Sequence, residues 1–215
     1  MTEVRCWPGL PPGAPEIEIP DAFLAALEDF GQRSARRGRE AGAFILGKAR
    51  GTAEGWWVRL EQLEEIAGDG DAETFTFPAE AFIRAHQQWR TWSTDEVRAR
   101  PEALHVVGWC HTHPGHGVFL SQPDLEVHHR KFPLPFQVAL VLDPLAIDAD
   151  RRMGLVAWTG EDMLSPHLPG TIATLAARPA KVPAPRKIRW SNGAWPWGVL
   201  PLIGALGWWL WHHGF

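Results

Sequence analysis

The sequence predicts an α+β domain in which helices flank one mixed β-sheet. Three observations support this fold class. Strand-like segments outnumber helical ones, the two kinds intermix along the chain, and several of the strands are apolar runs typical of buried sheet strands. Hydrophobic residues make up 45% of the 215-residue chain and charged residues 21%, a globular composition with enough length for one well-buried domain.

The individual elements follow from local patterns. The proline- and glycine-rich residues 1–15 are expected to be irregular. Strands are expected where polar and apolar residues alternate, or where a short apolar run stands alone, at Glu16–Ile19, Glu40–Lys48, Trp56–Glu65, Thr74–Phe77, Leu104–Cys110, Phe136–Leu142 and Gly154–Trp158. Helices are expected where apolar residues recur at helical spacing behind a proline, from Pro20 to near Gly38, from Pro78 to about Trp92, and over Pro123–Arg130.

The composition also suggests how the chain is divided. An irregular segment, 1–16, precedes the predicted domain at 17–165, and a Pro-rich basic linker follows at 166–193. Residues 194–213 contain the uncharged stretch WPWGVLPLIGALGWWLW, which as a helix would be about 26 Å long, near the lower limit for crossing a membrane.

Tryptophans at both ends of this stretch resemble interfacial belts, and basic residues precede it. We therefore predict a C-terminal transmembrane helix that anchors a cytoplasmic catalytic domain to the inner membrane. A tail that docks on the domain or on a partner is the alternative. The first residues contain no apolar run of a secretory signal, which agrees with a cytoplasmic domain.

Charge and cysteine content exclude several classes of function. The chain has 21 Lys and Arg against 25 Asp and Glu, a net charge of −4, so no basic excess indicates nucleic-acid binding. Two cysteines, Cys6 and Cys110, are too few for a disulfide scaffold or a four-cysteine zinc site.

The segment Gly108–Asp124, GWCHTHPGHGVFLSQPD, has the residue types of a catalytic zinc site. His111 and His113 are two residues apart, so on an extended backbone their side chains leave on the same side. Asp124 lies in the first turn of the helix that follows and can turn back toward them. Two imidazoles and one carboxylate leave a fourth tetrahedral position for water, whose pKa zinc lowers to about 7. We predict one catalytic Zn²⁺ ion held by these three residues.

Hydrolysis at such a site also requires a proton carrier and a donor to the oxyanion. Glu40 begins an apolar strand that is expected to lie beside the histidine-bearing strand, near the metal without binding it. Ser121 is a candidate oxyanion donor, or a cap of the helix that holds Asp124, and both roles stay open. The alternatives are a solvated connector residue at Glu40 and a pair of structural histidines at His111 and His113.

Together these residues resemble the JAMM (MPN+) metalloprotease signature: His-Thr-His-Pro, then Ser121 and Asp124 at the family's spacings, with Glu40 opening an upstream apolar strand. The flanking segments GWCHTHP, FLSQPDL and FQVALVLDP are similar too, and the resemblance extends over about residues 17–165. It implies the MPN (JAB) fold and membership of a prokaryotic, deubiquitinase-like branch.

The resemblance also implies zinc-dependent cleavage of the amide bond that follows the C-terminal tail of a ubiquitin-like protein. Such an isopeptidase or peptidase would act in deconjugation or precursor processing, as in bacterial conjugation and defence operons. A sulfur-carrier protein as substrate, or a non-catalytic MPN scaffold, are the alternatives.

Other residues near the motif are not assigned to this chemistry. A second, structural zinc found in some eukaryotic relatives is not expected, because Glu126 replaces a first ligand and no cysteine follows Cys110. Cys110 itself is expected to be a core residue. Loop, surface or packing roles are expected for His105, His116, His128 and His129.

Overall fold

The structure is a computed structural model that describes residues 4–7, 10, 12–67, 75–148, 151–159, 162–163 and 168–169. The chain divides into two units, Met1–Ala177 and Arg178–Phe215, and the described residues all belong to the first. The predicted C-terminal helix at 194–213 lies outside them, so it stays a prediction, as do the domain boundaries. None of the described helices is long and apolar enough to cross a membrane.

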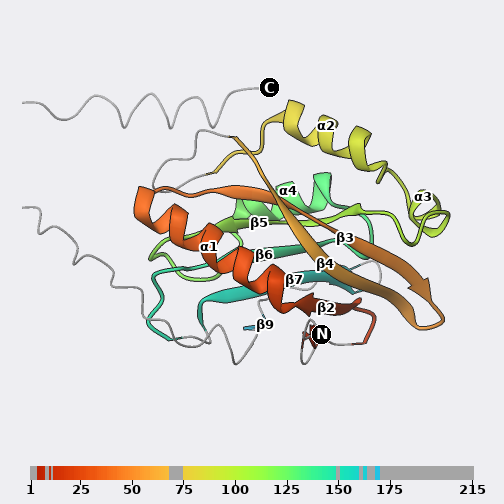
Figure 1. Ribbon diagram of the computed structural model, residues 1–215, viewed down its shortest axis with the longest axis horizontal. Helices are drawn as coiled ribbons and strands as arrows, with labels where there is room; N and C mark the ends of the chain where they lie inside the picture. Colours follow the sequence, from red (N-terminus) through yellow and green to blue (C-terminus); the bar gives the residue numbers. More distant parts are fainter. Residues whose placement is uncertain are drawn as a thin grey trace, which may run out of the picture. The chain divides into compact units, whose positions relative to one another are not determined.

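The described residues form one mixed sheet and four helices (Figure 1). The strands are β1 (Val4–Cys6), β2 (Glu16–Pro20), β3 (Gly42–Thr52), β4 (Gly55–Glu65), β5 (His105–Thr112), β6 (Val138–Leu142), β7 (Met153–Thr159), β8 (Asp162–Met163) and β9 (Leu168–Pro169). The helices are α1 (Asp21–Arg37), α2 (Ala79–Trp89), α3 (Thr94–Arg98) and α4 (Gln122–Lys131). These elements confirm the predicted α+β class.

The strand order is β1-β2-β4-β3-β5-β6-β7-β8, with β9 also paired to β7. Two pairs, β2 with β4 and β5 with β6, are parallel, and the other pairs are antiparallel. Strand β5 therefore lies in the middle of the sheet, between β3 and β6. Gly108 allows the close approach of β5 to β6, since a Cβ at this position would lie 2.1 Å from the carbonyl oxygen of Val138.

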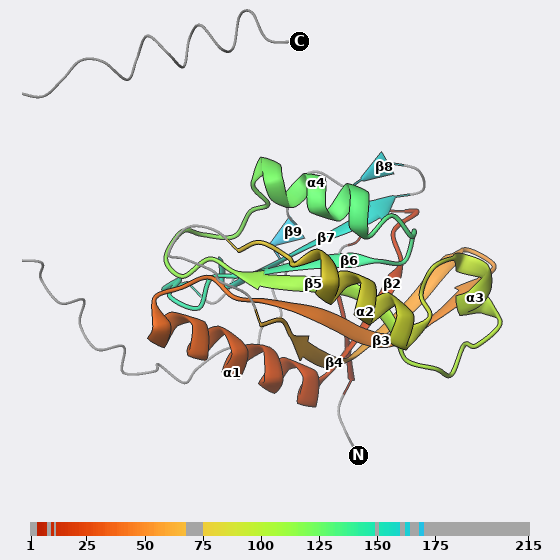
Figure 2. The same ribbon diagram turned by 90° about the horizontal axis from the view of Figure 1, so that it is seen from above.

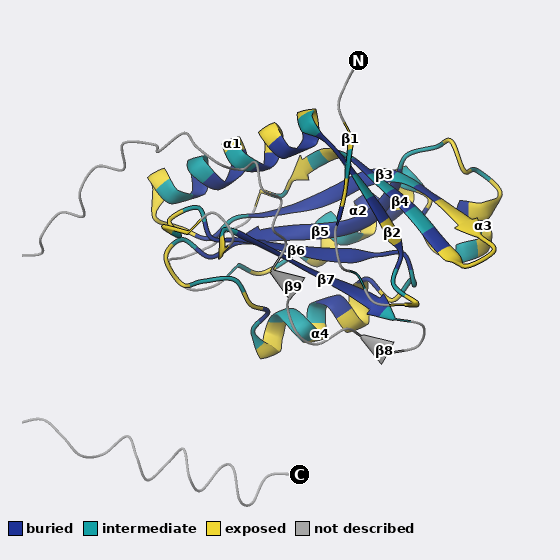
Figure 3. Ribbon diagram, turned by 90° about the horizontal axis from the view of Figure 1, so that it is seen from below, coloured by how far each residue is buried: buried dark blue, intermediate teal, exposed yellow. Residues whose placement is uncertain are grey.

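Helices cover both faces of the sheet, α1 on one side and α4 on the other (Figure 2). Because side chains alternate along a strand, Ala43 and Ile45 belong to the core cluster under α1, whereas Phe44 and Leu46 belong to the cluster beneath α2 and α4. Strands β5 and β6 are buried throughout, while α1 and α4 each expose one side (Figure 3). A central strand that is covered on both faces gives the site a rigid base.

Helix α1 leads directly to the candidate proton carrier. The helix follows Pro20, and Gly38 ends it in the left-handed conformation with φ of 60°. Its buried residues include Phe23, Leu24, Leu27 and Phe30, the apolar residues whose helical spacing predicts this helix. The chain then passes through Glu40 and enters β3 at Gly42, so the strand begins two residues later than predicted.

Two predictions about elements are wrong. Of the predicted strand Thr74–Phe77, residues 75–77 are described and do not form a strand. Phe77 packs edge-on against Trp109, at 5.0 Å between ring centroids, and Phe75 lies over Gly42. The segment predicted to be irregular contains β1, which pairs with β2 through only three residues, too few to give a recognisable pattern.

Two helical details also differ from the sequence pattern. Helix α2 ends at Trp89 rather than near Trp92, because Arg90 takes a left-handed conformation with φ of 49°. The five-residue helix α3 was not expected, and Ser93 caps it by accepting a hydrogen bond from the backbone N–H of Glu96.

Candidate metal centre

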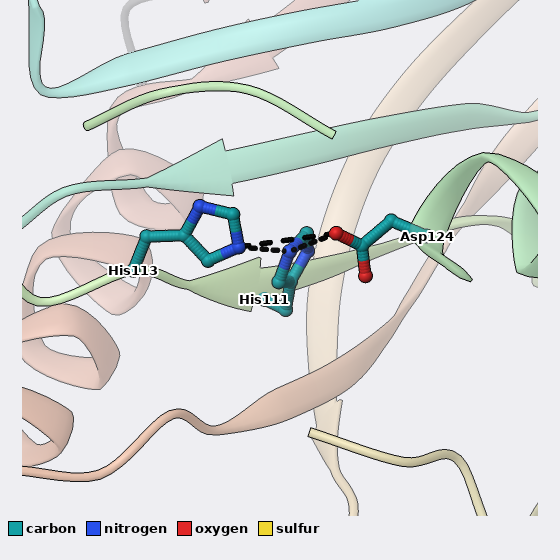
Figure 4. A group of neighbouring side chains, drawn as sticks. All are labelled: His111, His113 and Asp124. Atoms are coloured by element: carbon teal, nitrogen blue, oxygen red, sulfur yellow. Dashed lines mark hydrogen bonds and ion pairs between the residues drawn. The ribbon is translucent and has the colours of Figure 1, made fainter. Parts of the chain in front are cut away.

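The two histidines of the motif lie where β5 ends. Every residue of β5 is buried, and beyond its last residue the backbone N–H of His113 still donates to Leu142 at 2.7 Å. The extended backbone sends the side chains of His111 and His113 to the same side, as predicted, and their Nε2 atoms lie 2.7 Å apart (Figure 4). Both rings are buried, so their separation is fixed by the sheet.

Asp124 reaches the histidines from the first turn of α4. Ser121 is the N-cap of this helix and forms a capping box with Asp124. Asp124 Oδ2 accepts from the Ser121 backbone N–H at 2.8 Å and from its hydroxyl at 2.5 Å. The same oxygen lies 3.4 Å from His111 Nε2 and 3.9 Å from His113 Nε2. The capping role of Ser121 is therefore present in the structure.

The protonation of Asp124 and His113 suits metal binding. Burial raises the pKa of Asp124, but hydrogen bonds from His111 and Ser121 and the charge of His111 outweigh it and lower the pKa to about 2. Burial, followed by the proximity of His111, lowers the pKa of His113 to about 4. Since His113 Nδ1 lies 3.2 Å from the Gly117 carbonyl, its proton is on Nδ1 and the Nε2 lone pair faces the site.

The spacing of the three donors fits a metal ion. Donors bound tetrahedrally to zinc at about 2.0–2.1 Å lie roughly 3.3 Å from one another. The two histidine Nε2 atoms are 2.7 Å apart, and Asp124 Oδ2 lies 3.4 and 3.9 Å from them, so the separations fall on both sides of that value. All three ligand atoms lie within 4.8 Å of one another. His111, His113 and Asp124 can therefore hold a metal ion. Two histidines and one carboxylate are a ligand set typical of metallohydrolases.

Glu40 lies beside this group. Strand β3 pairs antiparallel with β5, with Gly42 opposite His111, and the Thr112 N–H donates to the Ala41 carbonyl at 3.0 Å. Continued by two residues, this register places Glu40 opposite His113, and Glu40 Oε1 is 3.7 Å from His113 Nε2. The residue is only 8% exposed, so it is not a solvated connector residue.

Asp143 supports the loop between the ligands and was not identified from the sequence. It follows β6, is 4% exposed, and accepts backbone N–H groups from Gly115, Gly117 and Leu145 at 2.8–3.0 Å. The two glycines have φ of 84° and 89°, values that favour glycine. Because the Gly117 carbonyl contacts His113, the carboxylate fixes the orientation of a candidate ligand. The sequence did not reveal this role, because an Asp-Pro pair after a strand predicts only a turn.

Aromatic side chains pack against both candidate histidine ligands. Trp109 stacks on His111 at 4.9 Å, and Phe119 packs against His113 at 4.7 Å. His128, expected only as a surface or packing residue, is fully buried and accepts the Trp109 indole N–H at 3.0 Å. The described structure thus gives His128 a specific polar contact, while His116 is an exposed loop residue as expected.

Comparisons with known proteins agree with this geometry. A family model described as prokaryotic homologs of the JAB domain matches residues 27–158. An NAD(+) hydrolase TcpA from Theionarchaea archaeon is 42% identical over 57 residues, 24% of this chain and 17% of that protein. The COP9 signalosome complex subunit 5 of Eremothecium gossypii is 46% identical over 48 residues, and that of Saccharomyces cerevisiae 44% over 55.

The signalosome matches cover 21% and 24% of this chain and 11% and 12% of those subunits, so the chain matches less than a fifth of each of these three relatives. The family model, in contrast, spans more than half of the chain and includes Glu40 and all three candidate ligands. The fold, the histidine and aspartate cluster and this match agree, and the chain belongs to the prokaryotic family of JAB-domain homologs.

Proposed function

We propose that the chain is a zinc-dependent isopeptidase or peptidase that cleaves the amide bond after the C-terminal tail of a ubiquitin-like protein. The supporting observation is the convergence of His111, His113 and Asp124, with the Glu40 carboxylate 3.7 Å from His113. A zinc ion at this position would polarise the scissile carbonyl and lower the pKa of a bound water.

In this proposal Glu40 takes the proton of the attacking water and delivers it to the leaving amine. Its position supports the role, because the carboxylate is buried next to the ligands and is not one of the three clustered donors. Ser121 stabilises the tetrahedral oxyanion. Its hydroxyl has one hydrogen, which donates to Asp124, so this role requires the hydroxyl to exchange that acceptor for the developing oxyanion.

The proposed substrate class rests on the family and on the motif. The relatives named above are an NAD(+) hydrolase and signalosome subunits, and their names do not agree on a substrate. A sulfur-carrier protein is the alternative substrate, and its extended tail would have the same chemistry. The intact ligand set argues against a scaffold without catalysis. We also propose that the catalytic domain is cytoplasmic and anchored to the inner membrane. This part of the proposal rests only on the sequence of residues 194–213.

The test is to incubate the purified full-length chain with ubiquitin-like and sulfur-carrier fusions from its own genome, with and without a chelator. Glu40→Gln should retain one zinc ion per chain and lose about 100- to 10,000-fold in turnover, the usual contribution of a general acid-base. The exposed Glu64→Gln on β4 is the matched control and should keep full turnover. Chelator-resistant cleavage would exclude the metal role, and full turnover in Glu40→Gln would exclude the proton carrier.

A further inference from the structure

Two buried hydroxyl groups connect the histidine-bearing strand to the segment that carries Glu40. Thr112 stands between the two candidate ligands, so its side chain leaves β5 on the opposite side. There its Oγ1 lies 2.5 Å from Oγ of Ser34, in the last turn of α1. Both residues are buried, at 0% and 1% exposure, so their hydrogens must find partners within the protein.

The hydrogens of this pair can be assigned in one direction. Ser34 Oγ donates to the Arg39 carbonyl at 2.6 Å, which uses its single hydrogen. Thr112 must then donate to Ser34, and Thr112 Oγ1 accepts the backbone N–H of Ala41 at 3.0 Å. The result is a continuous chain of hydrogen bonds from the Ala41 N–H through Thr112 and Ser34 to the Arg39 carbonyl. Its two ends are the backbone groups on either side of Glu40.

This arrangement is needed because Glu40 is in neither a helix nor a strand. Helix α1 ends at Arg37, Gly38 is left-handed, and β3 begins at Gly42. Across this short connection, backbone hydrogen bonds hold Arg39, whose N–H donates to the Ser34 carbonyl at 3.4 Å, and Ala41, whose carbonyl accepts the Thr112 N–H at 3.0 Å. The two hydroxyl groups add a second bond at each of these residues. A misplacement of about 1 Å at a reacting group can cost about 100-fold in rate. Groups that fix the backbone on both sides of Glu40 therefore affect the reaction itself.

We infer that Thr112 and Ser34 are positioning residues that hold the Glu40 carboxylate at the metal centre. This inference rests on the proposed role of Glu40 as proton carrier. Neither hydroxyl contacts the substrate or the metal ion, since both lie on the face of β5 opposite the ligands. They determine turnover by fixing the backbone that carries the carboxylate, and leave the three metal donors in place.

The test compares Thr112→Val, which removes the hydroxyl and keeps the branched shape, with Thr112→Ser, which keeps the hydroxyl. In the full-length chain, Thr112→Val should bind one zinc ion and keep its KM within about three-fold, while kcat falls about 10- to 100-fold. Thr112→Ser should restore most of kcat. In a Glu40→Gln background, Thr112→Val should cause no further loss, because the two changes act through the same group.

A matched control is available at the other end of β5. The buried Thr91 hydroxyl accepts the backbone N–H of Val106 at 2.9 Å, so Thr91→Val removes a comparable bond away from the site. Its kcat should remain at the wild-type level even where its stability falls. Loss of zinc in Thr112→Val, an unchanged kcat, or an equal further loss in the Glu40→Gln background would each overturn the positioning role.

Amide hydrogen exchange provides a readout that does not depend on activity. The Ala41 amide should exchange about ten-fold faster in Thr112→Val than in the wild type, and at the wild-type rate in Thr112→Ser. Unchanged Ala41 exchange in Thr112→Val would overturn the hydrogen-bond chain itself. If Ala41 exchange shows that these hydrogen bonds are present but Glu40→Gln has wild-type turnover, the proposed role of Glu40 fails, and the positioning role fails with it.

Discussion

His128 allows a quantitative test of the polar contacts behind the metal centre. Its ring is fully buried, stacks on Trp158 at 5.4 Å, and accepts the Trp109 indole N–H at Nδ1. Because Nδ1 is an acceptor, the ring is neutral, and a proton on Nδ1 would remove this bond. Burial is the main reason that the pKa of His128 falls from 6.5 to about 3, and the charge of His129 adds to it.

This lowered pKa makes stability depend on pH. In the unfolded chain His128 takes up a proton below pH 6.5, whereas in the folded protein it stays neutral until about pH 3. Its contribution to the free energy of unfolding is therefore complete above pH 6.5 and is lost as the pH falls from 6.5 toward 3. Between about pH 7.5 and about pH 5 the loss is about 2 kcal/mol, at roughly 1.4 kcal/mol for each unit below 6.5.

The variant His128→Asn has no titratable ring, and its amide oxygen can accept the Trp109 N–H. Urea unfolding followed by tryptophan fluorescence, with chelator present, should show that the wild type loses about 2 kcal/mol more than this variant between the two pH values. His86 and His105, whose pKa values burial also lowers, contribute equally to both proteins. The exposed His129→Asn on the same helix should behave like the wild type. Equal losses in the wild type and His128→Asn would refute the reasoning.

Two further predictions concern the loop and the helix cap. Asp143→Asn places an amide N–H₂ against a glycine N–H of the His113 loop, so zinc affinity should fall about 10- to 100-fold in competition with a chromophoric chelator. Unchanged affinity would show that the loop does not depend on the carboxylate. Ser121→Ala should lower kcat about 100- to 1000-fold and stability by about 1 kcal/mol. Ser93→Ala, which removes the cap of α3, should lower stability similarly without changing kcat. An unchanged kcat in Ser121→Ala would leave Ser121 with the capping role alone.

The parts of the fold that sequence predicted are those that local patterns determine. The apolar run after Glu40 predicted β3, and the helical spacing of Phe23 and Phe30 predicted α1. The two-residue spacing of His111 and His113 predicted that both side chains face one side, and the structure brings them together with Asp124. Each of these inferences needed only the helical or strand spacing of side chains, or residues close together in the sequence.

The supporting contacts could not be predicted in this way, because they join residues that are distant in the sequence. Ser34 and Thr112 are 78 positions apart, and Asp143 is 28 positions from Gly115. A lone serine in a helix, or an aspartate before a proline, has many local explanations, and only the tertiary fold selects one. Thr74–Phe77 shows the reverse error, since its alternation predicted a strand although Phe77 packs on Trp109 across the core.

This difference has a consequence for recognising catalysis in related chains. A ligand motif can persist in a protein whose proton carrier is displaced, because the backbone that holds Glu40 depends on Ser34 and Thr112 rather than on the ligands. A chain with the three donors but an apolar residue at the Thr112 position would be expected to bind zinc and turn over slowly. The hydroxyl pair is therefore a more demanding criterion for activity than the three metal donors. The motif contains Thr112 but not its partner Ser34, which only the hydrogen bonds of the tertiary fold identify.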